Sequence, residues 1–92
     1  MSGKEKLDEY IARIEEACGA EKDFIVFFKY EKRDEAIARI LKKARLERKI
    51  AGIIFDLTYN NISIRLYGTG KAIFKKIKEK NELNKVLNEL ML

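Results

Sequence analysis

The spacing of apolar residues along the chain alternates between a helical period near 3.6 and a strand period of two. Apolar residues recur at i, i+3, i+4 and i+7 in three stretches, which predict helices at about residues 4–18, 34–44 and 79–92. The first of these is followed by Gly19, a typical helix stop, and the second begins at Asp34, a residue type favoured at helix N-termini.

Strict alternation predicts strands at residues 52–58 and 61–67 and in the segment that begins at Lys71. The stretch DFIVFFKY, residues 23–30, is rich in β-branched and aromatic residues and predicts a further strand with two apolar faces. The helical period fails after Ala44, so residues 45–50 are predicted to be a short extended segment. The sequence YNN between two of these strands is typical of a hairpin turn.

Together these elements predict a single α+β domain over residues 1–92, with an antiparallel sheet packed by helices on one face. The predicted order is α-β-α-(β)-β-β-β-α, in which an N-terminal helix within residues 1–19 precedes the rest of the domain at 23–92.

Alternation also predicts which side chains point away from the helices. That outward face would mix basic, aromatic and apolar groups, which suits a nucleic acid because cations meet phosphates and rings stack on bases. A half-solvated sheet face or a protein interface built on its apolar members explains the same pattern. The predicted outward residues are Ile25, Phe27, Lys29, Ile54, Asp56, Thr58, Asn61, Ser63, Arg65, Tyr67, Lys71, Ile73 and Lys75.

The stretch LYGTGKAIF contains two glycines and a lysine, and it raises the question of a phosphate-binding loop. A P-loop requires a glycine at position 65, a hydroxyl residue at 72 and a following helix. Arg65 and Ala72 stand there, and a strand is predicted to follow. The stretch is therefore predicted to be a hairpin turn whose glycines supply positive φ.

The amino-acid composition argues against several kinds of site and location. The chain has no histidine and one cysteine, which argues against a transition-metal site, a cofactor site and paired nucleophiles. No apolar run is long enough to span a membrane, and the charged N-terminus lacks a signal-peptide core, so a cytoplasmic location is expected. The Lys-, Glu- and Ile-rich composition without proline or tryptophan is compatible with a thermophilic, for example archaeal, source or an AT-rich genome.

The net charge of +5 is distributed unevenly. Residues 24–50 contain nine basic and four acidic residues, and residues 71–92 contain six and three. A polyanion-binding surface or simple solubility would account for this surplus. Four of the basic residues are predicted to form an auxiliary patch, which is a solvated face or an additional phosphate contact: Arg39, Lys42, Lys43 and Lys49.

From Ile50 onward, the stretch IAGIIFDLTYNNISIRLYGTGKAIFKKIK resembles one repeat of the TATA-binding protein core. Gly52 matches the glycine of the F-P-G motif, Phe55 matches the aromatic residue that follows it, and NELNKVLNEL matches the long amphipathic helix. Upstream, FIVFFKY and RDEAIARIL resemble the first strand and helix of that repeat. The resemblance covers about residues 23–90.

The resemblance implies a curved antiparallel sheet with helices on its convex side and a concave face that binds DNA in the minor groove. Two repeats in one chain form a saddle in that family, so this single repeat would require a homodimer, and the strand at residues 24–30 is one candidate for the contact. At the wedging phenylalanine positions stand Ile50 and Tyr67, and Asp56 replaces a phosphate-contacting arginine. These departures argue against specific TATA recognition.

The sequence thus predicts a small non-enzymatic protein that binds nucleic acid, DNA before RNA, as a monomer or homodimer, with no membrane and no small-molecule substrate. A protein-interaction or homodimerising module that binds no nucleic acid is the alternative. The residues predicted to contact nucleic acid are Phe27, Lys29, Ile50, Arg65, Tyr67, Lys71, Ile73 and Lys75.

Overall fold

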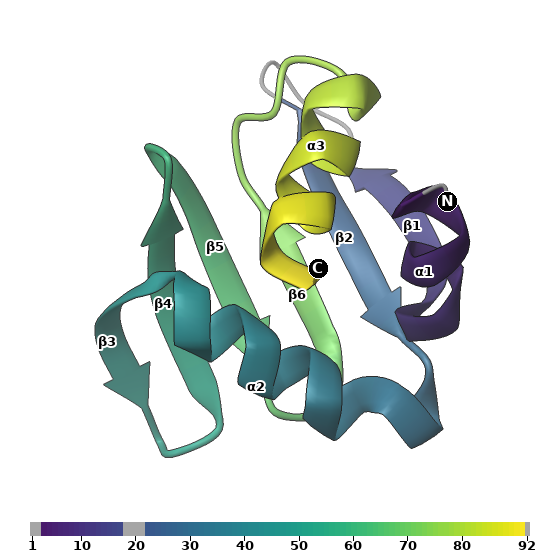
Figure 1. The fold of residues 1–92 in the computed structure, drawn as a ribbon. Coiled ribbons are helices and arrows are strands. Elements are labelled where there is room, and N and C mark those ends of the chain that lie inside the picture. The colour runs from purple at the N-terminus through teal and green to yellow at the C-terminus, as the bar shows by residue number, and fades with distance from the viewer. Residues whose placement is uncertain (1–2, 18–21, 92) are drawn as a thin grey trace.

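The computed structural model describes residues 3–17 and 22–91. Figure 1 shows an antiparallel, curved sheet with the helices in front of one of its faces, and the other face is not covered by any described element. The elements in chain order are α1 (Gly3–Tyr10), β1 (Ile11–Ala17), β2 (Asp23–Phe28), the 3-10 turn η1 (Tyr30–Lys32), α2 (Arg33–Lys43), β3 (Arg45–Ile50), β4 (Ile54–Tyr59), β5 (Ile62–Tyr67), β6 (Lys71–Phe74) and α3 (Lys80–Met91).

The strands lie in the order β1-β2-β6-β5-β4-β3, and every neighbouring pair is antiparallel. The α+β class, the antiparallel sheet and the two helices α2 and α3 are as predicted. The extended segment before β4 is confirmed as β3, which pairs with β4 at the edge of the sheet.

The N-terminal prediction was wrong in its second half. The expected helix over residues 4–18 ends at Tyr10, and the chain continues as β1 along the edge of β2. From Cys18 to residue 21 the chain lies outside the described residues. An open edge on an apolar strand presents unpaired main-chain groups that another chain can pair with, and β1 covers the edge of β2 that β6 leaves open.

A β-bulge explains why this strand looked helical. The pairing of β1 with β2 shifts between Ile11 and Arg13, which inserts Ala12 as an extra residue. The bulge places Ile11 and Ile14, three positions apart, on the same face of the sheet, where both pack against the core. A spacing of three is the one that a helix produces, so the apolar pattern alone could not separate the two structures.

The same strand pairing bears on the expected homodimer contact, because it leaves the outward face of β2, and not its edges, for such a contact. Residues 24–30 were a candidate for a homodimer contact, but β2 is paired on one side with β1 and on the other with β6. Its edges are therefore occupied within the chain. Tyr30, expected to continue that strand inward, lies in η1 instead and is 77% exposed.

The core lies between the sheet and the helices. Alternate residues of β2, β4, β5 and β6 point into it, as predicted, and meet the apolar stripes of α2 and α3. Phe74, Leu66, Ile40 and Leu87 are all fully buried there. Ile53, predicted to point inward, precedes β4 and is 56% exposed.

Two tight turns fix the register of the central strands. Asn60 and Asn61 both have positive φ, 50° and 66°, which is the geometry of a two-residue hairpin between β4 and β5. In the turn between β5 and β6, Gly70 has a φ of 112°, whereas Gly68 does not have positive φ. The prediction that GTG is a strand-to-strand turn is confirmed, although one of its two glycines supplies the left-handed conformation.

Candidate nucleic-acid interface

The face of the sheet away from the helices, here called the open face, carries two rows of side chains that each cross all six strands. Residues that pair across antiparallel strands share a face, so the register defines each row. The aromatic row is Arg13, Phe27, Lys71, Tyr67, Ile54 and Ile50. The ionic row is Glu15, Ile25, Ile73, Arg65, Asp56 and Arg48.

The aromatic row combines rings with cations and contains no acidic residue. The Arg13 guanidinium lies 4.1 Å from the centre of the Phe27 ring, and the Lys71 ammonium lies 4.9 Å from the centre of the Tyr67 ring. Both distances are those of cation–π contacts. The Arg13 guanidinium is also paired with Glu15 of the ionic row, to which its Nε donates at 2.8 Å. Each ring thus lies beside a cation and an apolar strip, and proteins commonly bind single-stranded nucleic acids with rings and cations.

A third ring–cation pair lies beside the turn between β5 and β6. The Arg33 guanidinium is 4.2 Å from the centre of the Tyr30 ring. The stem of Arg33 packs on Gly70, where an added Cβ would come within 3.2 Å of the Arg33 Cβ. Gly70 therefore permits this close approach, and the basic and aromatic character of the open face continues around the end of the sheet.

The ionic row is centred on Asp56. Its carboxylate accepts two hydrogen bonds from the Arg65 guanidinium, at 2.8 and 3.2 Å, and lies 3.7 Å from the Nε of Arg48. The bonds from Arg65 hold the pKa of Asp56 below its ordinary value, despite the opposing effect of partial burial, and raise the pKa of Arg65. Two cations thus accompany the carboxylate that would otherwise repel a phosphate.

Seven of the eight residues predicted to contact nucleic acid lie on the open face or at its rim. Lys75 follows β6 and, together with Ser63 and Arg48, lines a shallow hollow of about 310 Å³ there. Lys29 lies outside both rows, directly after β2, and its amide N–H donates to the carbonyl oxygen of Tyr10 at 2.8 Å. The other six lie in the two rows: Phe27, Ile50, Tyr67, Lys71, Arg65 and Ile73.

Sequence reasoning missed three cations of the open face, which are Arg13, Arg48 and, through its pairing with Thr58, Arg45. Arg13 was assigned to a helix, and no local signal separates that assignment from a bulged strand. Arg48 alternates with Ile50 in the extended segment, so strand alternation could have placed it on the same face as Ile50, where the structure has it.

Three of the four residues of the predicted auxiliary patch lie together, because Arg39, Lys42 and Lys43 line one hollow on α2, and Lys49 lies apart from them. Arg39 donates to the main-chain carbonyl of Met91 and, at 3.2 Å, to Glu35, while Lys43 donates to the carbonyl of Glu89 at 2.7 Å. Both therefore tie α2 to the C-terminal turn of α3, where cations are favoured. Lys49 lies on the helix side of β3, 5.8 Å from the centre of the Phe55 ring.

The described residues contain no group of three or more cysteine, aspartate or glutamate side chains placed to hold a metal ion. No helix in the same part of the chain has both the length and the apolar character needed to cross a membrane.

Comparisons of the chain with models of known protein families, with curated proteins and with solved structures found no match. The geometry of the open face therefore carries the functional argument.

Proposed function

We propose that this chain is a small non-enzymatic nucleic-acid-binding protein, with DNA as its first target, and that it binds through the open face. The observation that carries this proposal is the aromatic row, in which two cation-capped rings and two isoleucines cross the sheet without an intervening acid. On binding, the cations would contact phosphates, and the rings would be free to stack on bases.

We also propose that residues 23–91 form a TATA-binding-protein-like half. In its support, β2, α2, the four strands β3 to β6 and α3 follow the order of strand, helix, strands and helix that the resemblance implies. The open face is also the face away from the helices, as the DNA-binding face is in that family. A saddle built through the edge of β2 would require β1 to leave it, so the described fold supports binding as a single half.

The test is a fluorescence anisotropy titration with duplex DNA, single-stranded DNA and RNA at about 50 and 200 mM salt. The salt slope is the steepness with which log affinity falls as log salt concentration rises. The Lys71→Ala substitution should weaken binding several-fold and reduce the salt slope by about one, because one phosphate contact is lost. The Tyr67→Leu substitution should weaken binding with little change in the salt slope, because a stacking surface is lost and no charge is removed. The Lys85→Ala substitution removes an exposed cation of α3, on the helix side of the molecule, and is the matched control.

A variant that is expected to strengthen binding adds a second test. Asp56→Asn removes a negative charge from the open face and leaves Arg65 and Arg48 uncompensated, so affinity and salt slope should both rise. Arg65→Ala and Lys75→Ala should lower both. The absence of binding to any of the three nucleic acids at about 50 mM salt would refute the nucleic-acid proposal.

A second candidate function is a protein-interaction or homodimerising module. Ile25 and Ile73 are directly paired and half-buried at the middle of the open face, and Phe27 lies one row away. An apolar centre with a charged surround is also typical of a protein interface. This candidate predicts a salt-insensitive complex that Phe27→Glu or Ile73→Glu disrupts, measured by sedimentation.

A further inference from the structure

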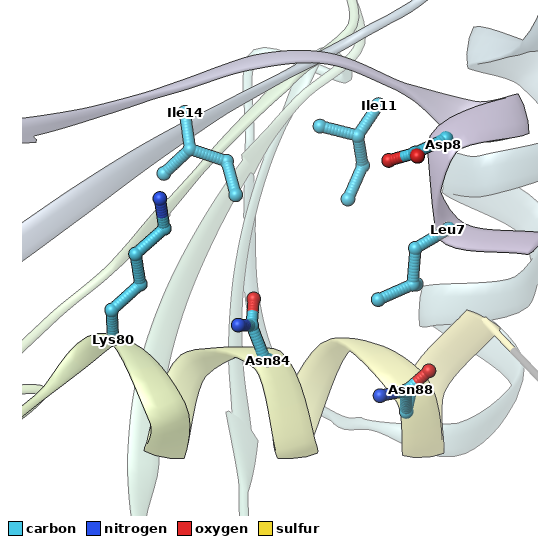
Figure 2. Close-up of a pocket in the computed structure, with 7 residues that line it drawn as sticks. All are labelled: Leu7, Asp8, Ile11, Ile14, Lys80, Asn84 and Asn88. Atoms are coloured by element: carbon cyan, nitrogen blue, oxygen red, sulfur yellow. The ribbon is translucent and has the colours of Figure 1, made fainter. Parts of the chain in front are cut away.

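A groove separates α3 from β1 and α1 on the helix side of the molecule, away from the open face. Its volume is about 510 Å³, which falls in the range of sites that hold small ligands. Figure 2 shows that Ile11 and Ile14 of β1 form its apolar floor, whereas α3 presents a polar wall of Asn84 and Asn88. The two surfaces that face each other thus differ in chemistry.

One atom of the polar wall lacks a partner. The side-chain oxygen Oδ1 of Asn88 is buried, yet it accepts no hydrogen bond from any described residue. Leaving a buried acceptor unpaired costs folding free energy, and native proteins rarely tolerate it without a reason. A turn of the Asn88 side chain toward the groove, which this residue lines, would bring the oxygen within reach of an N–H group of a ligand.

The spacing of the two asparagines matches an extended peptide. Asn84 and Asn88 are four positions apart on α3, which is a rise of about 6 Å along the helix. The main-chain groups on one edge of an extended peptide repeat every two residues, about 6.6 Å. A carboxamide offers one acceptor and two donors, so each asparagine can pair with both the N–H and the C=O of one peptide residue.

The two ends of the groove carry opposite charges. Figure 2 shows Asp8 of α1 at one end and Lys80, at the start of α3, at the other. The distance from position 80 to position 88 along the helix axis is about 12 Å, enough for about four extended residues.

We propose that this groove binds a short peptide segment in extended conformation. Its main chain pairs with Asn84 and Asn88, and its apolar side chains rest on Ile11 and Ile14. A basic group lies at the end near Asp8, and an acidic group lies at the end near Lys80. This proposal is independent of the nucleic-acid function, because the groove and the open face lie on opposite sides of the sheet.

The test uses the synthetic peptide acetyl-Lys-Val-Ser-Val-Glu-amide, titrated to about 1 mM into the full chain and followed by NMR. The methyl signals of Ile11 and Ile14 and the side-chain amide signals of Asn84 and Asn88 should shift together. The peptide with its two charged residues exchanged should bind more weakly. No shift at these signals, or equal binding of both peptides, would overturn the proposal.

Variants separate binding from folding. Asn88→Leu removes an unpaired buried acceptor, so it should leave the stability of the protein unchanged or raise it, while peptide affinity falls about tenfold. Asn84→Ala, at an exposed position of the same wall, should weaken binding without affecting the fold. Asn81→Ala, on the same helix but not in the groove, is the matched control and should bind as the original chain does.

Two outcomes would contradict the assignment directly. Unchanged affinity in both Asn84→Ala and Asn88→Leu would remove the role of the carboxamides. Concentration-dependent shifts of the groove signals without peptide would place a second copy of the chain there instead of a peptide.

Discussion

Asp56 determines how much positive charge the middle of the open face presents. Its carboxylate is bonded to Arg65, lies near Arg48 and is 21% exposed, so its charge is partly shielded from water. A single carboxylate thus balances two cations in the folded protein. The same residue links the stability of the fold to pH, because its pKa differs between the folded and unfolded chain.

We expect Asp56 to stabilise the protein only above acidic pH. Hydrogen bonds from Arg65 lower its pKa in the folded state below the ordinary value of 3.8. Its stabilising contribution is therefore fully present above that ordinary value and is lost as pH falls through the lower, folded pKa. Urea unfolding of the original chain should show a steeper loss of stability below about pH 4 than unfolding of Asp56→Asn.

Glu35 has a pKa that is lowered in the same way, mainly by the Tyr10 hydroxyl that donates to it at 2.8 Å, so the variant should keep part of the acid dependence. Equal slopes for the two chains below about pH 4 would contradict the role assigned to Asp56.

At the scale of elements, β1 is the part of the fold that most changes the properties of the molecule. It covers the edge of β2, a strand whose sequence DFIVFF is apolar on both faces. An uncovered strand of this kind would be a template for pairing with another chain. The short α1–β1 unit thus acts as an edge cover for the rest of the sheet.

Removal of residues 1–22 should therefore cause association. The remaining chain keeps five strands, α2 and α3, but it exposes the edge of β2 and the core surface that Leu7 and Tyr10 cover. Sedimentation should show concentration-dependent dimers or aggregates that the full-length chain does not form at the same concentration. Circular dichroism first establishes that the shortened chain is folded. A folded shortened chain that sediments like the full chain would contradict the edge-cover role.

The basic residues of α2 should differ in their contribution to the free energy of unfolding, because they make different contacts. Arg39→Ala should lower the free energy of unfolding by about 1 kcal/mol, because it removes the bonds to the Met91 carbonyl and to Glu35. Lys42→Ala should change that free energy by less than about 0.5 kcal/mol, as exposed positions usually do. Denaturant unfolding measures both, and a larger effect at Lys42 than at Arg39 would refute this division.

At the scale of the whole molecule, one apolar cluster connects the helices with the sheet. It includes buried residues from α1, α2, α3 and the strands β2, β4, β5 and β6. A domain with a single core of this kind is expected to unfold in one cooperative step. The open face contributes little to that core, so its side chains can change with less cost to stability.

The Leu87→Ala substitution tests this cooperativity. Leu87 is fully buried on α3, and its truncation should lower the free energy of unfolding by about 2–4 kcal/mol. The denaturant midpoint should fall while the slope of the transition stays the same, because the same surface is still exposed in one step. Different midpoints by circular dichroism and tyrosine fluorescence would show instead that α3 unfolds separately.

Much of the fold was predictable because most of its elements have a clear period. The alternation in β4, β5 and β6 assigned Phe55, Leu66 and Phe74 to the core side and Tyr67 and Lys71 to the other, and the structure agrees. These assignments need local information alone, since each side chain of a strand points to the face opposite its neighbours.

The amino-acid sequence by itself determined the class of fold, the β5–β6 turn at GTG and most members of the open face. Only the tertiary structure decided that residues 11–17 are a strand, because a bulge imitates the helical period and the edge of β2 supplies the missing partner. It also decided that Arg39 and Lys43 bind the end of α3 and that Asn88 faces a groove. These features depend on contacts between residues distant in the chain, which no local pattern encodes.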